Sequence, residues 1–237
     1  MKFLLPYPIS IVIPVFNEEK ALKKVYMELM ETLSEQFEGF EIIYVNDAST
    51  DDTKAQLEEM EKQDSRVSVF HHFKNEGQSK ALFTGIQNAN FETVVMMDGD
   101  EQYDPRDILE LCGLLQDKVR LVSGKRDNRK DSFLYKTFSF IGNSLIAFFF
   151  RMEKFDLGCG LKVGYKKDLI SLPYFKYVHR YLQIIYFNSG LEIAQVEINH
   201  RPRTTGQSKY SIWKVLNIIP RLLWLKFYKP RLNYLQR

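Results

Sequence analysis

The chain has 237 residues, of which 45% are hydrophobic and 27% carry a charge. This length and balance suit one large α/β domain or two small ones, and they exclude a mainly disordered chain. The formal net charge is only +3, but it is unevenly distributed, because no acidic residue follows Glu197 while Lys and Arg continue to Arg237. A basic C-terminal part points toward phosphate groups or an anionic membrane surface as partners.

The two cysteines, Cys112 and Cys159, lie far apart, with neither CxxC spacing nor a cluster of histidines beside them. This usage predicts a reducing, cytosolic compartment and no zinc site. The N-terminus lacks the features of a signal peptide. The longest apolar run, residues 138–150, is interrupted by Ser, Gly and Asn. It is shorter than the ~20 residues that span a bilayer, so we predict no transmembrane segment.

Short apolar runs alternate with helical periodicity over the first half of the chain. We predict strands at residues 10–15, 41–46, 67–71, 93–98 and 119–123, and helices at 19–34, 51–64, 78–88 and 105–115. The strands are apolar on both faces, as in a parallel sheet covered by helices on both sides. Asp51 and Asp52 suit the first turn of the second helix. The pattern predicts an α/β protein with a mostly parallel central sheet.

Polar side chains follow each of the first four predicted strands. They are Asn17 and Glu18, then Asp47 and Ser49, then Lys74, Asn75 and Gly77, and finally Asp98 and Asp100. Ligands of open parallel sheets bind beyond the carboxyl ends of the strands, so we expect these residues to form one site. Neither GxGxxG nor a P-loop occurs. A site of carboxylates and amides would need a metal ion to hold phosphates.

The segment 98–102 places two carboxylates one residue apart after a buried strand. Asp98, Asp100 and Gln102 project in the same direction from an extended chain. Their oxygen atoms could together bind one Mg2+ or Mn2+ ion, and Gly99 would allow close approach of the backbone. The alternative is an acidic turn whose aspartates are solvated.

Four segments resemble the donor half of a family 2 glycosyltransferase of GT-A fold: IPVFNEE at 13–19, NDASTD at 46–51, NEGQ at 75–78 and DGDEQYDP at 98–105. Three more resemble the acceptor half of its polyprenyl-phosphate branch, the dolichol-phosphate mannosyltransferase type: DLGCGLK at 156–162, His179-Arg180, and HRPRTTGQSKY at 200–210. The resemblance implies a Rossmann-like β/α/β sandwich. Its catalytic domain would span residues 1–210, with a donor half at 1–125, an acceptor half at 126–210 and a basic amphipathic segment at 211–237.

The resemblance also implies a nucleotide-sugar donor, either a UDP-sugar or a GDP-sugar. The donor-binding residues that it implies are Pro14, Phe16, Asn17, Glu18, Asp47, Ser49, Lys74, Gly77, Asp98 and Gly99, and the implied metal ligands for Mg2+ or Mn2+ are Asp98, Asp100 and Gln102. Phe16 could pack on the base, and Asp47 could accept a hydrogen bond from it. The alternative for Asp47 and Ser49 is a helix cap.

The implied acceptor is a polyprenyl phosphate, such as undecaprenyl or dolichyl phosphate. The residues that the resemblance implies for its binding are Lys162, His179, Arg180, Arg203, Ser208 and Lys209. A basic cluster after the fifth predicted strand adds Arg126 and Arg129, and a polar stripe on the apolar helix that follows adds Ser139. Arg126 and Arg203 are the first candidates for the phosphate, because guanidinium groups bind phosphate oxygens in pairs. Lys162 stands where many relatives carry Arg. The alternatives are a solvated loop for Arg129 and a structural role for His179.

A phosphate monoester is already largely ionised near neutral pH, so the implied inverting transfer needs no dedicated general base. The residues implied to act in catalysis are Asp98, Asp100, Asp156, Arg126 and Arg203. Asp156 would orient the acceptor loop or the sugar, whereas a glycan or protein hydroxyl acceptor would need it as a base. A third alternative is a nucleotide-sugar-binding or membrane scaffold protein without activity.

The C-terminal segment 211–237 has the pattern of an amphipathic helix. Its apolar face carries Ile212, Val215, Leu216, Ile219, Leu222 and Leu223. This composition predicts a helix in a membrane interface, and hence a peripheral protein on the cytoplasmic face of a membrane. The alternatives are a helix docked on the sheet, on a second copy in a homo-oligomer, or on a membrane protein. We expect no nucleic-acid partner.

Overall fold

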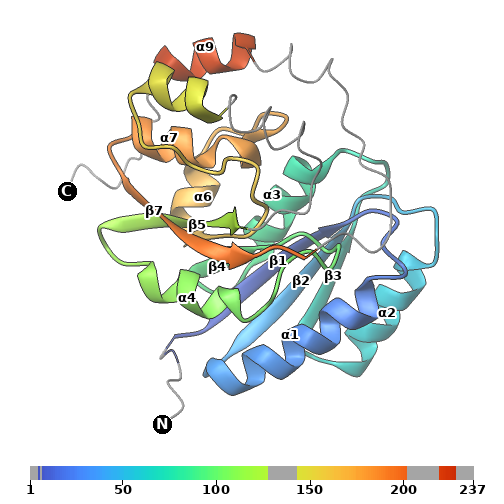
Figure 1. Ribbon diagram of the computed structural model, residues 1–237. Coiled ribbons are helices and arrows are strands. Elements are labelled where there is room, and N and C mark those ends of the chain that lie inside the picture. Colours follow the sequence, from blue (N-terminus) through green and yellow to red (C-terminus); the bar gives the residue numbers. More distant parts are fainter. Residues whose placement is uncertain (1–4, 6, 128–142, 202–218, 228–237) are drawn as a thin grey trace.

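The structure, a computed structural model, describes residues 5, 7–127, 143–201 and 219–227. Within these ranges the strands form a seven-stranded sheet in the order β3-β2-β1-β4-β6-β5-β7 (Figure 1). The strands are β1 Ile9–Val15, β2 Phe40–Asn46, β3 Val67–His71, β4 Thr93–Met96, β5 Val119–Asp127, β6 Lys162–Tyr165 and β7 Glu192–Asn199. The first five correspond to the predicted strands, and β6 and β7 were not predicted.

The sheet is mostly parallel, as predicted. Strand β1 pairs in parallel with β2 and β4, and β2 pairs in parallel with β3. Strand β6 is the antiparallel member, with Val163 opposite Val95 of β4 on one side and Val122 of β5 on the other. The edge strand β7 returns to the parallel direction beside β5. The insertion of β6 next to β4 brings the second half of the chain to the strand that precedes Asp98.

Helices cover both faces of the sheet (Figure 1). The helices are α1 Leu22–Gln36, α2 Thr53–Gln63, α3 Gln78–Asn88, α4 Asp107–Leu114, α6 Lys166–Ser171, α7 Leu182–Asn188 and α9 Ile219–Phe227, with a 3-10 turn η1 at Val178–Arg180 and a further helical stretch at 143–150. Along β1 the buried side chains alternate, as strand geometry requires. Ile11 and Ile13 pack with α1, α2 and α4, whereas Val12 packs with α3, α6 and α7.

Three helices begin two or three residues later than predicted: α1 at Leu22, α2 at Thr53 and α4 at Asp107. Strand β4 also ends earlier, at Met96. In the connections that precede these helices, Asn17, Ala48 and Glu101 adopt left-handed backbone conformations, with φ of 58°, 61° and 62°. Such turns interrupt both strand and helix geometry. They create loops beyond the strand ends in which the predicted site residues lie.

The helix α9 is the described part of the predicted amphipathic segment. Asn188 Nδ2 of α7 donates a hydrogen bond of 2.7 Å to the Leu225 carbonyl, and Leu225 is fully buried. Phe227 on the same helix is 83% exposed. Among the described helices, none has the length and apolar character needed to cross a membrane.

Candidate active site

The loops after β1 and β2 are joined into one unit by hydrogen bonds. The Asn17 amide donates to Ser49 Oγ at 3.0 Å, and the Asn17 side-chain oxygen accepts from the Thr50 amide at 2.8 Å. The Glu18 amide donates to Thr53 Oγ1 at 2.9 Å. Ser49 therefore fixes the loop that carries Asn17 and Glu18, two of the predicted donor-binding residues.

Asp47 is buried and fixes the connection between β3 and α3. Its Oδ1 accepts from the Glu76 amide at 2.9 Å and its Oδ2 from the Gly77 amide at 2.8 Å. His72 Nδ1 lies 2.8 Å from Asp47 Oδ1, while His72 Nε2 lies 3.0 Å from Thr84 Oγ1 on α3. Asp47 thus accepts hydrogen bonds from the amides that precede α3 and does not cap α2. His72 is not among the predicted site residues, because nothing in the local sequence marks it as a partner of Asp47.

The remaining donor-side residues lie around these loops. Pro14 is the sixth residue of β1, and Phe16 follows the strand in a half-buried position. Lys74 is exposed in the loop between β3 and α3. Gly99 packs on β1, since a Cβ atom there would lie 2.9 Å from Val15 Cγ1. This packing against β1 accounts for a glycine at position 99.

Asp98 lies where the two halves of the chain meet. Its Oδ1 accepts a hydrogen bond of 2.5 Å from Gln78 Nε2, at the start of α3. Its carboxylate also packs directly against Gly160, where an added Cβ atom would overlap it. Gln78 belongs to the NEGQ segment but was not among the predicted site residues. The acceptor-side loop therefore packs directly against a predicted metal ligand.

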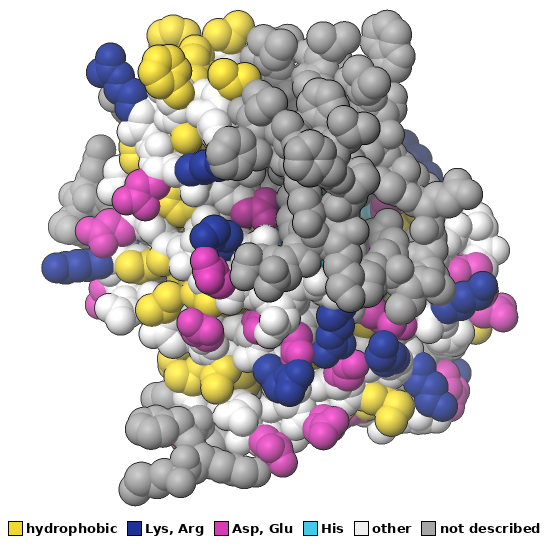
Figure 2. All heavy atoms as spheres, in the orientation of Figure 1, with side chains coloured by type: hydrophobic (Ala, Val, Ile, Leu, Met, Phe, Trp, Pro, Cys, Tyr) yellow, Lys and Arg dark blue, Asp and Glu magenta, His cyan; other side chains and the backbone are white. Residues whose placement is uncertain are grey.

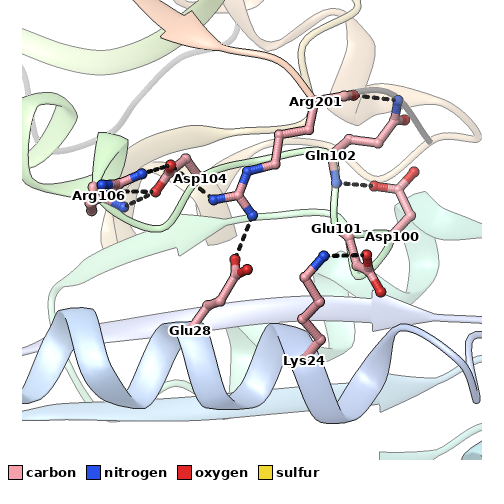
Figure 3. Close-up of polar contacts among 8 residues, drawn as sticks. All are labelled: Lys24, Glu28, Asp100, Glu101, Gln102, Asp104, Arg106 and Arg201. Atoms are coloured by element: carbon pink, nitrogen blue, oxygen red, sulfur yellow. Dashed lines mark hydrogen bonds and ion pairs between the residues drawn. The ribbon is translucent and has the colours of Figure 1, made fainter. Parts of the chain in front are cut away.

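Asp100 and Gln102 lie two and four residues after Asp98 in the same loop, and Figure 3 shows both. Asp100 is 7% exposed, and its Oδ1 accepts from the Gln102 amide at 3.4 Å. The Gln102 side chain points to the carbonyl of Arg201, with Nε2 at 3.4 Å. Gln102 thus lies in the same loop as Asp98 and Asp100, but its side-chain nitrogen donates to Arg201.

The carboxylate oxygens of Asp98 and Asp100 are ligands of the kind that a divalent cation prefers. Among the described residues there is no group of three or more His, Cys, Asp or Glu side chains that could hold a metal. Mg2+ is commonly held by one or two carboxylates together with substrate phosphates and water, without an all-protein cage. Two carboxylates on one loop match that mode. Asp98 and Asp100 would hold the ion, and the remaining ligands would come from substrate and water.

Tyr103 connects the same loop to the acceptor side. Its hydroxyl accepts a hydrogen bond of 2.7 Å from the Gly160 amide, and its ring meets that of His200 edge to face at 5.5 Å. Burial raises the pKa of Tyr103 well above its ordinary value, so the phenol stays neutral. Tyr103 lies in the DGDEQYDP segment, and that motif was the available signal for its role.

Arg126 and Asp156 form a bidentate ion pair inside the acceptor half. Arg126 Nε and Nη2 lie 2.7 and 2.8 Å from the two carboxylate oxygens, and the side chains are 11% and 10% exposed. Burial opposes the guanidinium charge, but the hydrogen bonds and charge of Asp156 raise the pKa of Arg126 above its ordinary value. Two residues predicted separately as phosphate ligand and loop orienter thus act as one unit.

Lys162 is a buried lysine of the site. It begins β6 opposite Met96 of β4, is 3% exposed, and donates from Nζ to the Cys159 carbonyl. Burial lowers the pKa of Lys162, and the charges of Asp156 and Asp98 oppose that effect. Lys162 therefore lies within electrostatic reach of Asp98, Asp156 and Arg126.

His179 and Arg180 occupy η1, next to α3. His179 Nδ1 lies 2.6 Å from Ser79 Oγ. Burial lowers the pKa of His179 well below 6.5, with further contributions from Arg180 and Lys162, so its imidazole is neutral. Arg180 lies over the Tyr177 ring at 5.6 Å. A neutral His179 can meet a phosphate only as a hydrogen-bond donor.

Several predicted acceptor residues lie outside the described ranges. They are Arg129, Ser139, Arg203, Ser208 and Lys209. Their predicted contacts remain predictions, as do those of Gln102 and the donor-binding residues. What the structure brings together is the loop of Asp98 and Asp100 with the loop of Asp156 to Lys162.

The family model "Glycosyl transferase family 2" matches residues 10–171. The sheet with its loop of paired carboxylates is thus that of a glycosyltransferase, and the chain belongs to glycosyl transferase family 2. This family match confirms the resemblance inferred from the sequence motifs.

The names of two curated relatives each include a polyprenyl phosphate. An undecaprenyl-phosphate 4-deoxy-4-formamido-L-arabinose transferase from Proteus mirabilis is 29% identical over 217 residues, covering 91% of this chain and 66% of the relative. A dodecaprenyl-phosphate galacturonate synthase from Rhizobium johnstonii is 30% identical over 225 residues, covering 93% and 67%. The chain thus spans about two-thirds of the length of these relatives.

Solved structures confirm the fold. Glucosyl-3-phosphoglycerate synthase from Mycobacterium tuberculosis, in complex with phosphoglyceric acid, superposes with a TM-score of 0.72 at 21% identity, over 92% of this chain and 80% of that one. The same enzyme with Mn2+, UDP-glucose and phosphoglyceric acid gives a TM-score of 0.72 at 20% identity, over 93% and 80%. At this identity the likeness establishes the α/β GT-A type fold.

Proposed function

We propose that the protein moves a sugar from a nucleotide-sugar donor to a polyprenyl phosphate, in an inverting reaction that needs a divalent metal ion. One observation carries the proposal. The loop of Asp98 and Asp100 is packed against a loop from the second half of the chain through Gly160. Lys162 is buried at that junction. An acidic loop of the kind that binds metal ions, beside the buried basic residues Lys162 and Arg126, suits a reaction between two phosphorylated substrates.

The donor would lie over the joined loops of β1 and β2. Asn17, Glu18 and Asp47 would surround the nucleoside, with Phe16 against the base. Asp98 and Asp100 would hold Mg2+ or Mn2+, which when bound neutralises the charge that develops on the leaving diphosphate. The two relatives act on lipid phosphates by name, and a solved neighbour binds UDP-glucose with Mn2+. Both support this assignment of donor and acceptor.

The acceptor phosphate would approach from the side of Lys162 and Arg126. One of its oxygen atoms attacks the anomeric carbon, the bond from that carbon to the diphosphate oxygen breaks, and the configuration at the carbon inverts. A phosphate monoester already carries the electron pair that it needs, so no protein base takes part. Lys162, Arg126 and Arg203 would hold the phosphate, and Asp156 would hold Arg126 in place.

The predicted membrane contact belongs to the same proposal. On α9, Trp224 is 47% exposed and Phe227 83%, and on the helical stretch 143–150 Phe148 is 86% exposed. Lys226 Nζ donates to the Phe149 carbonyl at 2.8 Å, so the two helices are neighbours. Apolar side chains gather on this end of the molecule (Figure 2). Aromatic residues beside a lysine suit a peripheral contact with the cytoplasmic face of a membrane.

A donor screen tests the function. Purified protein would be incubated with single UDP-sugars and GDP-sugars, a short-chain polyprenyl phosphate, and either Mg2+ or Mn2+, and the lipid products analysed by mass spectrometry. We expect one donor to give a lipid phosphate whose mass has increased by one sugar residue. Consumption of a donor without any glycosylated lipid phosphate would refute the proposed acceptor.

A further inference from the structure

The loop that carries Asp98 and Asp100 contains a backbone conformation that needs support. Glu101, between Asp100 and Gln102, has a φ of 62°. Non-glycine residues rarely adopt this left-handed conformation, and it persists where the surroundings fix it. The direction of the Asp100 carboxylate depends on this turn. Contacts that hold the turn therefore control the presentation of the predicted metal ligand.

Arg201 makes four such contacts with the loop and its neighbours (Figure 3). Its amide donates to the Gln102 carbonyl at 2.9 Å, and its own carbonyl accepts from Gln102 Nε2 at 3.4 Å. Its guanidinium donates to Asp104 Oδ2 at 2.9 Å and to Glu28 Oε2 at 2.6 Å. The backbone of Arg201 thus binds the loop at Gln102, and its side chain binds the loop at Asp104.

Helix α1 provides the fixed base for these contacts. Lys24 and Glu28 lie one helical turn apart, and Lys24 Nζ is 2.9 Å from Glu101 Oε2. Glu28 reaches Arg201, which in turn reaches Asp104. The loop is therefore tied to α1 at Glu101 directly and at Asp104 through Arg201. We call Lys24, Glu28 and Arg201 the brace.

We propose that Arg201 is a positioning residue for the metal-binding loop, acting on Asp100 through Gln102 and Asp104. The proposal rests on the proposed metal-dependent function. The planar guanidinium has N–H groups in several directions, which allows one side chain to bridge Glu28 and Asp104. Its side chain is 31% exposed, so the ion pairs themselves add little stability. The role of these ion pairs is to fix the conformation of the loop that carries Asp100.

Arg106 offers a matched control. It also pairs with Asp104, with Nε at 2.9 Å from Oδ1 and Nη2 at 2.5 Å from Oδ2. Its side chain is 77% exposed, and it takes no part in the brace. Substitution of Arg106 removes a charge from the same carboxylate without removing the links to Gln102 or α1.

The first test is hydrogen exchange in protein without metal or nucleotide. Peptides that cover residues 99–104 and 199–202 would be followed by mass spectrometry in wild type, Arg201→Gln, Glu28→Gln and Arg106→Gln. Loss of one net hydrogen-bonded link predicts roughly fivefold faster exchange in these peptides for Arg201→Gln and Glu28→Gln. Arg106→Gln should exchange as wild type does. Equal exchange in all four proteins would overturn the brace.

The second test is calorimetric titration with UDP and with GDP, each with and without Mn2+. If Arg201 positions Asp100, Arg201→Gln should weaken the Mn2+-dependent part of nucleotide binding about tenfold, with metal-free binding unchanged. Arg201→Lys should recover only part of it. Equal weakening with and without Mn2+ would contradict a role through the metal loop. If wild type binds neither nucleotide, the proposed function fails, while the exchange result still decides whether the brace exists.

Discussion

Arg126 and Asp156 bind each other through two parallel hydrogen bonds of 2.7 and 2.8 Å, in a pair that is about nine-tenths buried. Both oxygens of Asp156 accept from the guanidinium. A base for a hydroxyl acceptor would have to face that acceptor, so this geometry favours an acceptor that needs no base. It also makes Asp156 the residue that orients Arg126.

Substitution of Asp156 should therefore affect stability and acceptor affinity together. Removing one partner of a buried pair leaves an uncompensated charge, so Asp156→Asn should lower the free energy of unfolding by about 3 kcal/mol, measured by urea denaturation. The Michaelis constant for lipid phosphate should rise, while the pH profile of turnover keeps its shape. Loss of a single ionisation from that profile would instead identify Asp156 as a base.

The Arg120–Asp168 pair is the control for this experiment. It is bidentate, with distances of 2.7 and 2.8 Å, and its side chains are 8% and 0% exposed. It lies near the other end of β5 from Arg126. Asp168→Asn should lower the free energy of unfolding by a similar amount and leave the Michaelis constant for lipid phosphate unchanged.

A side chain at position 160 should displace the Asp98 carboxylate. A Cβ atom there would overlap the Asp98 carboxylate, so Gly160→Ala should displace Asp98 and weaken Mn2+-dependent nucleotide binding about tenfold. Calorimetric titration measures the loss. Gly113 in α4 has open space around its Cβ position, so Gly113→Ala should leave binding unchanged and stabilise the helix by up to about 1 kcal/mol. Normal binding by Gly160→Ala would show that Asp98 is not a ligand.

Asp107 should make stability depend on pH. Burial, followed by the charge of Asp104, raises the pKa of Asp107 to about 6. The folded state therefore binds this proton more tightly than the unfolded state, and the free energy of unfolding falls as pH rises from about 4 to 6. Asp107→Asn removes the penalty and can still accept the bond from the Asn199 amide.

This substitution should stabilise the protein by about 1 kcal/mol at pH 7.5, after allowance for solvent screening of a half-buried group. At pH 4 the difference should nearly vanish, because wild-type Asp107 is then protonated in the folded state. Thermal unfolding at the two pH values measures both. An equal stabilisation at pH 4 and pH 7.5 would show that charge is not the cause.

The exposed aromatic residues of α9 and of the stretch 143–150 should determine membrane binding. Each phenylalanine buried in an interface contributes roughly 2 kcal/mol. The double substitution Phe148→Ser with Phe227→Ser should therefore reduce binding to anionic phosphatidylglycerol vesicles by more than about tenfold in a sedimentation assay. Phe73 is also fully exposed but lies in the loop after β3, so Phe73→Ser should bind as wild type. Equal binding by the double variant would place the membrane contact elsewhere.

The first five strands could be predicted because each is an apolar run bounded by polar residues. Strand β6 could not, since its four residues, KVGY, include the buried Lys162. Only its neighbours β4 and β5 make that position a strand. Strand β7 has the alternating pattern EIAQVEIN, which is a strand signal that could have predicted it.

The residues of the site were more predictable than their partners. Ordered motifs identified Asp98, Asp100 and Asp156 one by one, and a basic cluster after the fifth strand identified Arg126. The pairing of Arg126 with Asp156 spans 30 residues, and that of Arg201 with Glu28 spans 173. Contacts of such sequence separation follow from the topology of the sheet, which local patterns do not specify. His72 and Arg201 were missed for that reason.

The central claim is that a lipid phosphate, and not a hydroxyl, receives the sugar at the loop of Asp98 and Asp100. The most direct measurement offers equal amounts of a short polyprenyl phosphate and the corresponding polyprenol, with the active donor and metal, and follows both by mass spectrometry. We predict a glycosylated phosphate, no glycosylated alcohol, and at least about tenfold slower product formation by Asp100→Ala. Sugar on the alcohol, or equal rates in the two proteins, would contradict the account.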